Sequence, residues 1–252
     1  MFSIFKKKYP VSPDFSGIQA DMHSHLLPGI DDGSPDTEIS LELIAGLTDL
    51  GYSSFITTPH IISDMYPNTP ETILDAKLDL DKAARTENKE LNITAAAEYY
   101  LDDYFAELLK SSKPLLTLRY NLVLVEFSFV SLPFNYKQLI FDLQLAGYQP
   151  VLAHPERYGY LMNQKEVYDD LRSAGCIFQM NLLSLTGYYG KQPQQQAEYL
   201  VKNKFITLLG TDLHHHRHLD ALRSAGQLQP VINDLLDSGK LMNPVLNVKR
   251  EA

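Results

Sequence analysis

Histidines and carboxylates recur in this 252-residue chain where short apolar runs end. Residues i and i+2 of an extended strand point to the same side, so His23 and His25 can hold one ion, as can Asp212 and His214. Imidazole nitrogens and carboxylate oxygens together suit zinc, manganese and iron. Six of seven runs end in such residues: His23 and His25, His60, Glu98, Glu126, His154, and Asp212 with His214. One pair alone could be buried and hydrogen-bonded, but so many strand ends together predict a metal site.

The apolar runs are typical of strands buried on both faces, because several are nearly continuous rather than alternating. The predicted strands are Gly17–Met22, Ser53–Thr58, Leu91–Ala97, Asn121–Phe127, Gln149–Ala153, Cys176–Asn181 and Phe205–Gly210. Helical segments between them are predicted after Ser34-Pro35 and near Pro70–Lys89, Asp102–Ser111, Asn135–Ala146, Gln164–Ala174 and Pro193–Lys202. This alternation favours an α/β barrel, with an open doubly wound sheet as the alternative. In both folds, ligands bind at the carboxyl ends of the strands.

Helix boundaries are marked by cap and glycine signals. Ser34-Pro35 is typical of a cap followed by proline at the first helical position. Gly51, Gly147 and Gly175 each stand between a helical segment and the next strand, where they are expected to end the helix.

Composition narrows the function classes. The net charge of −9 argues against broad nucleic-acid binding, which needs a basic face. The single cysteine, Cys176, rules out an internal disulfide and fits a reducing compartment, so we expect a cytoplasmic protein. No apolar run approaches the roughly 18 residues that span a bilayer, so no transmembrane segment is expected. The basic start, residues 1–8, is predicted to lie in a terminal tail, with a weak membrane-touching or docking segment as the alternative.

Other hydrolytic chemistries lack their motifs. Cysteine phosphatases use Cys-x5-Arg, but the sixth residue after Cys176 is Leu182. Cys176 also lies in an apolar strand, which indicates a small core residue. Gly-x-Ser-x-Gly, a Walker loop and His-Glu-x-x-His are absent from the sequence.

The order of the histidine and carboxylate motifs resembles that of polymerase and histidinol phosphatase (PHP) domains. The motifs are Asp-Met-His-Ser-His, Thr-Pro-His, Ala-Glu-Tyr-Tyr, Val-Glu-Phe-Ser, Ala-His-Pro-Glu-Arg-Tyr and Thr-Asp-Leu-His. The segment Leu26–Ser34 is most similar to the bacterial capsule and exopolysaccharide tyrosine-protein phosphatases. The resemblance covers roughly residues 18–220. It implies a distorted seven-stranded, TIM-like (β/α)7 barrel of PHP type, in one domain over 18–252 after a tail at 1–17.

The resemblance also implies ligands for three divalent ions, with Mn²⁺ as the first choice and iron or zinc as alternatives. The first ion would be held by His23, His25, Glu98 and Asp212. Glu98 would bridge to a second ion, completed by Glu126 and His154. The third would be held by Asp32, His60 and His214. Arg157 matches the phosphate-binding arginine, and Arg217 is favoured over Arg223 as a second one.

The implied function is hydrolysis of phosphotyrosine by metal-activated water, with a role in capsular or exopolysaccharide biosynthesis. The implied partner is a phosphotyrosine protein, namely the tail of a polysaccharide-assembly tyrosine kinase. Small-molecule phosphatase activity of the histidinol-phosphate type is the alternative, and a non-catalytic metal-stabilised scaffold is the alternative of another class. Tyrosines that could line a cleft or pack at loop bases are Tyr99, Tyr100, Tyr158, Tyr188 and Tyr189. The sequence leaves the oligomeric state open, a homo-oligomer included.

Overall fold

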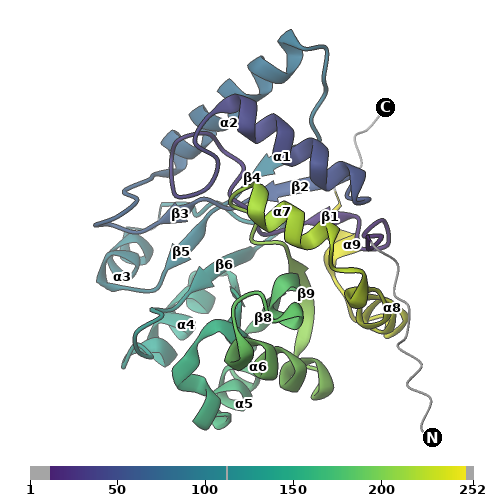
Figure 1. Ribbon diagram of the computed structural model, residues 1–252. Helices are drawn as coiled ribbons and strands as arrows, with labels where there is room; N and C mark the ends of the chain where they lie inside the picture. The colour runs from purple at the N-terminus through teal and green to yellow at the C-terminus, as the bar shows by residue number, and fades with distance from the viewer. Residues whose placement is uncertain (1–11, 112, 248–252) are drawn as a thin grey trace, which may run out of the picture.

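The computed structural model describes residues 12–111 and 113–247, and their strands lie in two parallel sheets surrounded by helices (Figure 1). The smaller sheet has the order β1 (Ala20–Asp21), β2 (Ser54–Thr57), β4 (Ile93–Ala95). The larger has the order β3 (His60–Ile61), β5 (Glu98–Tyr100), β6 (Leu122–Glu126), β7 (Gln149–Leu152), β8 (Ile177–Asn181), β9 (Ile206–Gly210). Adjacent strands in both sheets run parallel.

Backbone hydrogen bonds link the two sheets along both edges. On one side, the Glu98 N–H of β5 donates at 3.0 Å to the carbonyl of Pro59, which lies between β2 and β3. On the other side, the Asp212 N–H donates to the His23 carbonyl at 2.7 Å, and the residues after β1 and β9 form a parallel bridge. The carboxyl ends of strands from both sheets therefore lie close together.

Each of the seven predicted strands contains an observed strand, and β3 and β5 are two further short strands. The predicted helices are observed as α1 (Thr37–Asp49), α2 (Pro70–Thr86), α3 (Asp103–Lys110), α4 (Tyr136–Leu145), α5 (Glu166–Ser173) and α6 (Lys191–Lys202). Three helices follow that the sequence analysis did not predict: α7 (His216–Arg223), α8 (Gln229–Asp237) and α9 (Asn243–Leu246).

The predicted cap of the first helix was wrong by two residues. Asp36, not Ser34, is the N-cap of α1, and its side chain accepts a hydrogen bond from the Ile39 N–H at 2.9 Å. Ser34 instead donates through its hydroxyl to the Asp36 carbonyl, which steadies the turn before the helix. The glycine signals were right, since Gly51, Gly147 and Gly175 all have φ between 84° and 105°, where glycine avoids a Cβ clash.

The continuous apolar runs are explained by burial on both sides of the sheet. In β6, Leu122 and Leu124 belong to a small core cluster with Met22 and Leu208. The alternate residues of β6, Val123 and Val125, face a larger cluster that includes the helices. Both faces of the strand are therefore apolar, as a covered parallel sheet requires.

Residues 1–11, which include the basic start of the predicted tail, lie outside the described part of the chain. Phe15 falls within the predicted tail at 1–17, but it is fully buried in the larger core cluster. Its N–H donates to the Leu50 carbonyl at 2.8 Å. Within the described residues, no helix is both long and apolar enough to cross a membrane.

Candidate metal centre

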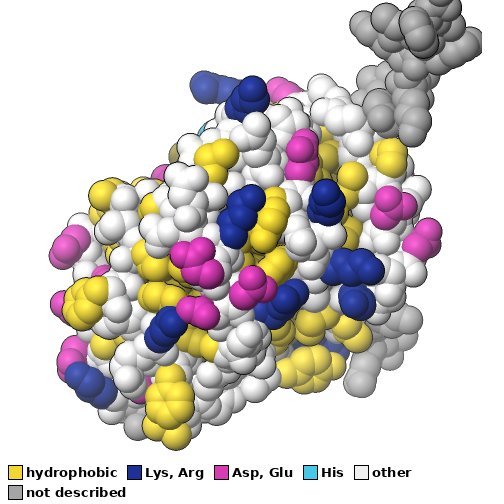
Figure 2. All heavy atoms as spheres, turned by 90° about the horizontal axis from the view of Figure 1, so that it is seen from below, with side chains coloured by type: hydrophobic (Ala, Val, Ile, Leu, Met, Phe, Trp, Pro, Cys, Tyr) yellow, Lys and Arg dark blue, Asp and Glu magenta, His cyan; other side chains and the backbone are white. Residues whose placement is uncertain are grey.

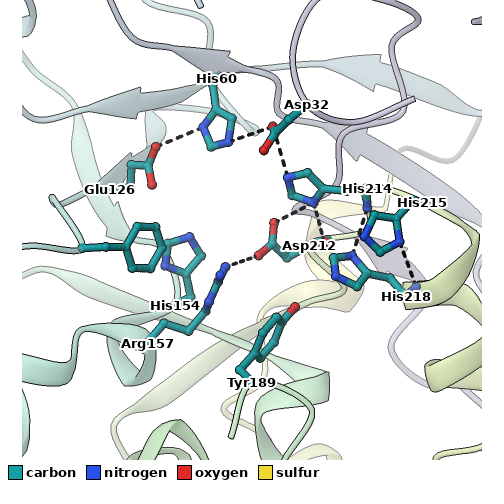
Figure 3. A pocket seen from close by; sticks show the side chains of 11 residues that line it. Asp32, His60, Glu126, His154, Arg157, Tyr189, Asp212, His214, His215 and His218 are labelled. Carbon is teal, nitrogen blue, oxygen red and sulfur yellow. Dashed lines mark hydrogen bonds and ion pairs between the residues drawn. The ribbon is translucent and has the colours of Figure 1, made fainter. Parts of the chain in front are cut away.

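A pocket of about 240 Å³ opens at the carboxyl ends of the strands (Figure 3). Its walls come from β3, from the end of β6, from the segments that follow β6, β7, β8 and β9, and from the loop before α1. The lining residues are Asp32, His60, Glu126, Phe129, His154, Arg157, Tyr189, Asp212, His214, His215 and His218. Segments far apart in the sequence thus share one cavity.

The four residues expected to hold the first ion converge beside this pocket. The His23 Nε2 lies 3.0 Å from the Glu98 Oε2, and the His25 Nε2 lies 3.4 Å from the same oxygen. Both nitrogens are 3.4 Å from the Asp212 Oδ1. All four side chains are buried, so their lone pairs meet in one small volume away from solvent.

Glu98 stands between the first group of ligand atoms and a second. Its Oε1 lies 3.1 Å from the His154 Nε2, and its Oε2 lies 3.3 Å from the His60 Nδ1. The same His60 nitrogen is 3.0 Å from the Glu126 Oε1. The structure therefore brings Glu126 and His154 beside Glu98 as expected, and it adds His60 to this group.

The third expected group also meets in the structure. The Asp32 Oδ1 lies 3.5 Å from the Nε2 atoms of both His60 and His214. His25 offers a ligand atom to this group as well. Asp32 is partly exposed, unlike the deeper carboxylates, and so lies on the solvent side of the cluster.

The donor atoms of these residues fit divalent ions. The ligand residues form four overlapping groups, and within each group the ligand atoms lie within 4.8 Å of one another. The His25 Nε2, the His60 Nδ1 and the Glu98 Oε1 are buried without a hydrogen bond, which is costly unless another partner binds them. The donors are nitrogen and oxygen, a set that suits manganese, iron and zinc. The geometry thus supports the binding of divalent metal.

The pKa shifts of the ligand-type residues also favour a bound cation. Burial alone would lower the pKa of His23, but Glu98 and Asp212 outweigh burial and raise that pKa to about 9. Burial would raise the pKa of the Glu98 carboxyl, but His23 and His60 hold it well below its usual range. Buried carboxylates thus retain protons on the neighbouring imidazoles. A divalent cation would take the place of these protons, because metal ligation requires neutral imidazole.

Three outer contacts orient the histidines so that each Nε2 faces the other ligands. The Nδ1 of His23 lies 2.8 Å from the Gln179 Oε1, and the Nδ1 of His25 lies 2.7 Å from the Asp31 Oδ2. The Nδ1 of His214 lies 2.9 Å from the Asp212 carbonyl oxygen. When each Nδ1–H donates to these oxygens, the Nε2 lone pair is left for an ion.

Gln179 and Asp31 orient ligand histidines although neither was predicted from the sequence to do so. Gln179 lies two residues before Asn181 on β8, so both point to the same side, and alternation was the signal available. The Gln179 Nε2 donates to the Asn181 Oδ1 at 2.9 Å, and the Asn181 Nδ2 donates to the Asp212 Oδ2 at 2.6 Å. β8 thus supplies support for ligands from β1 and β9.

Arg157 extends into the pocket from the 3₁₀ turn Pro155–Arg157 (Figure 3). Its Nη1 donates to the Asp212 Oδ2 at 2.8 Å. Its guanidinium carbon lies 4.4 Å from the ring centre of Tyr189 and 4.8 Å from that of Phe129. Burial would lower the pKa of Arg157, but Asp212 outweighs burial and raises it. The guanidinium is therefore charged and held in place.

Two of the ligand-type residues have left-handed backbones. His154 has φ 33° and Asp212 has φ 51°, a region that non-glycine residues seldom adopt. The Asp212 N–H donates to the His23 carbonyl, and the His154 N–H donates to the Gln179 Oε1 at 3.2 Å. Such strain persists where the surroundings determine the conformation, and it gathers at functional sites.

The structure does not bring Arg217 into the pocket. Arg217 is exposed on α7, and among the described residues Arg157 is the one arginine that lines the cavity. His215 and His218 line the pocket, where His218 is buried and His215 is exposed. The His218 Nδ1 accepts from the His214 N–H at 3.3 Å. The turn into α7 thus points these two histidines inward and Arg217 outward.

The five tyrosines expected at a cleft lie in different places: two are in the core, one lines the pocket, and Tyr100 and Tyr188 do neither. Tyr99 and Tyr158 are fully buried in the core, and the Tyr99 hydroxyl accepts from the Leu116 N–H. Of the five candidates, Tyr189 alone belongs to the described pocket lining, and its buried hydroxyl has no hydrogen-bond partner there. Cys176 is buried as expected, and burial raises the pKa of its thiol to about 12, which makes a thiolate nucleophile untenable.

Comparison with known proteins decides the family. The family model described as "Capsular polysaccharide synthesis, CpsB/CapC" matches residues 19–224. This chain belongs to the CpsB/CapC family. The resemblance noted from its motifs is thereby confirmed at the level of that family.

Relatives within the CpsB/CapC family match over most of their length. The tyrosine-protein phosphatase YwqE of Bacillus subtilis is 31% identical over 195 residues, which cover 77% of each chain. The tyrosine-protein phosphatase CpsB of Streptococcus pneumoniae is 29% identical and covers 77% of this chain and 82% of its own. A solved structure from work on YwqE and CpsB, described as "unique metal-dependent tyrosine phosphatases", superimposes with a TM-score of 0.74 at 29% identity. It covers 89% of this chain and 94% of the other.

Proposed function

We propose that this protein is a metal-dependent protein-tyrosine phosphatase. The observation that carries the proposal is the convergence of nine ligand-type side chains and one charged arginine at a single pocket. Membership of the CpsB/CapC family supports the same activity, since the relatives YwqE and CpsB bear the name tyrosine-protein phosphatase.

The residues proposed to hold three divalent ions, with Mn²⁺ as the first choice, are His23, His25, Asp32, His60, Glu98, Glu126, His154, Asp212 and His214. When bound, such ions neutralise the charge of a phosphate ester, orient it and lower the pKa of water. The deep carboxylates and histidines would hold the ions, while Asp32 and His214 border the open side of the pocket.

Arg157 is the residue that we expect to bind the phosphoryl group. One guanidinium nitrogen is occupied by Asp212, which leaves further N–H donors for phosphate oxygens. The rings of Phe129 and Tyr189 beside the guanidinium restrict its movement. A tyrosine leaving group suits this site, because a phenol with a pKa of about 10 departs with less help from an acid than an alkyl alcohol.

We infer that the two sheets form one distorted seven-stranded barrel of TIM-like (β/α)7 type. β2 and β3 are consecutive parts of one interrupted strand, and so are β4 and β5. The nine short strands therefore count as seven barrel strands. The bridge between Ser24 and Leu213 supports closure between β1 and β9. We also treat residues 18–252 as a single phosphatase domain, whose core Phe15 extends on the N-terminal side.

The proposed cellular role is control of capsular or exopolysaccharide biosynthesis. It rests on the family description and on the relatives' names. The proposed partner is a phosphotyrosine-bearing protein of that machinery, such as the tail of its tyrosine kinase. A cytoplasmic location stays a prediction from the single cysteine.

The test combines metal analysis with turnover of four substrates by the purified protein. These are p-nitrophenyl phosphate, a phosphotyrosine peptide, the matched phosphoserine peptide and histidinol phosphate. We expect chelation to abolish activity and Mn²⁺ to restore it, with the phosphotyrosine peptide preferred to the phosphoserine peptide and histidinol phosphate. Full activity in a verified metal-free sample would defeat the proposal, and better turnover of histidinol phosphate would favour a small-molecule phosphatase.

A matched pair of variants assigns the activity to this site. Glu98→Gln removes the carboxylate between two groups of ligand atoms, and we expect it to lower both metal content and turnover. Glu42→Gln makes the same change at a surface residue that pairs with His216 at 2.8 Å, and it should leave both unchanged. Equal effects of the two changes would argue against the assignment.

A further inference from the structure

The segment between β6 and α4, residues 127–135, carries the two most exposed large apolar side chains of the described residues, and a third that is half exposed. Phe134 is 98% exposed, Val130 is 89% exposed, and Phe129 is 48% exposed. Scattered apolar side chains are ordinary on protein surfaces, and Figure 2 shows several of them among charged groups on the face seen from below. The segment 127–135 differs because three such residues lie within six positions and one of them lines the pocket.

The base of this segment is attached to the residues that carry the chemistry. The Phe127 N–H donates to the Tyr158 hydroxyl at 2.9 Å, and the Tyr160 hydroxyl donates to the Ser128 carbonyl at 2.8 Å. The Phe129 ring stacks on His154 with ring centres 5.5 Å apart, and it also contacts the Arg157 guanidinium. The position of the segment relative to Arg157 is therefore set by several independent contacts.

Beyond Phe129 the chain leaves the pocket wall. The Val130 N–H donates to the Ser128 hydroxyl at 3.1 Å, which closes a local turn. Phe134 lies five positions after Phe129, so their Cα atoms can be at most about 18 Å apart. An extended peptide rises about 3.3 Å per residue, so a distance of about 18 Å corresponds to about five residues. Residues up to about five positions from a bound phosphotyrosine could therefore contact the exposed side chains.

We propose that Phe129, Val130 and Phe134 form a docking surface for apolar residues next to the phosphotyrosine in an extended substrate peptide. This inference rests on the proposed function, since it concerns the substrate of the same pocket. The pocket of about 240 Å³ accommodates one side chain at a time, so the rest of a protein substrate must lie over its rim. Phe129 is common to the pocket and the rim, and it makes the docking surface continuous with the reaction site.

A peptide is a better occupant of this surface than an anionic membrane. The protein carries a net charge of −9, which opposes approach to a negative lipid surface. The docking surface begins at Phe129 in the pocket wall. A substrate peptide needs this continuity with the pocket, whereas a surface for a second copy of the chain does not. A second copy or a lipid surface is therefore treated as an outcome that would overturn the proposal.

The experiment uses the double substitution Val130→Ser/Phe134→Ser in the metal-loaded protein. Neither residue belongs to the pocket lining, and both side chains are already in solvent, so the fold should tolerate the change. We expect kcat/KM for a phosphotyrosine peptide with flanking leucines to fall about tenfold. Turnover of p-nitrophenyl phosphate, which occupies the pocket alone, should stay within about twofold of the wild type.

A control variant and a binding assay complete the test. Phe141→Ser/Leu145→Ser removes two exposed apolar side chains from α4, which ends just before β7 begins, away from the pocket, and should leave both substrates unaffected. Binding of a non-hydrolysable phosphonomethyl-phenylalanine peptide, measured by fluorescence anisotropy, should weaken when its flanking leucines become serines. It should also weaken in Val130→Ser/Phe134→Ser.

The outcomes separate this proposal from the proposed function. If the wild type hydrolyses neither substrate, the phosphatase activity fails, and the anisotropy assay still tests docking. If Val130→Ser/Phe134→Ser lowers both substrates equally, or neither, or if leucine and serine peptides bind equally, docking is overturned. A shift of oligomeric state or loss of vesicle binding in this variant, with unchanged peptide binding, would assign the surface to a second copy or to a membrane.

Discussion

Asp31→Asn tests whether an outer carboxylate sets the metal affinity of the site. The Asp31 Oδ2 lies 2.7 Å from the His25 Nδ1 and accepts the His60 N–H at 3.2 Å, while the Oδ1 accepts the Gly33 N–H at 2.9 Å. Burial raises the pKa of Asp31, but His25 outweighs burial and holds it below its usual range. The carboxylate therefore carries charge where it supports a ligand.

The size of the effect follows from these contacts. Loss of an outer partner of a metal-ligating histidine costs about 10- to 100-fold in metal affinity, or about 1.4–2.8 kcal/mol. Asparagine has one oxygen for these donors, so its NH₂ would face the Gly33 N–H if the oxygen kept His25. One unsatisfied donor lowers the free energy of unfolding of the metal-free protein by about 1–3 kcal/mol.

The assay is calorimetric titration of the metal-free protein with Mn²⁺, with urea unfolding measured separately. The control is Asp36→Asn, which removes the same charge from the same loop. Asparagine caps a helix as well as aspartate does, so α1 and the metal affinity should both be preserved. A metal affinity of folded Asp31→Asn within about twofold of the wild type would refute the reasoning.

Three further predictions concern the pocket and its supports. Arg157→Ala should lower kcat/KM for a phosphotyrosine peptide by about 100-fold or more, because it removes a hydrogen-bond donor to the transition state. The metal content, measured by elemental analysis, should stay unchanged. A parallel loss of metal would make the role of Arg157 structural. Cys176→Ala should retain the turnover of the wild type. In the folded wild type, Cys176 should resist iodoacetamide at pH 8 until urea unfolds the protein, because burial raises its thiol pKa to about 12. Rapid labelling of the folded protein would contradict its burial. Gly33→Ala would place a Cβ against the His25 carbonyl oxygen and Cβ. We expect it to lower the free energy of unfolding in urea by about 1–3 kcal/mol and to weaken Mn²⁺ binding. An unchanged unfolding midpoint would show that the loop adapts.

Much of the architecture follows from local features of the chain. Apolar runs such as Leu122–Glu126 predict strands because both of their faces are covered, and glycines such as Gly51 end helices because they adopt positive φ. Helix α7 was not predicted, because it begins within the histidine run and its N-cap is His215, a residue type that does not by itself mark a helix start. The shift of the α1 cap from Ser34 to Asp36 shows the usual limit of such signals, since neighbouring residues can both act as caps.

The sequence by itself determined which residue types end the strands, and therefore that histidines and carboxylates gather where parallel strands end. Only the tertiary structure decided which of them meet, since Glu98 touches His23, His60 and His154 across segments far apart in the chain. It also decided that Arg157 points into the pocket and Arg217 into solvent, because the direction of a side chain on a turn or helix depends on how that element packs. The outer partners Asp31 and Gln179 follow the same rule, since their roles exist only through contacts that folding creates.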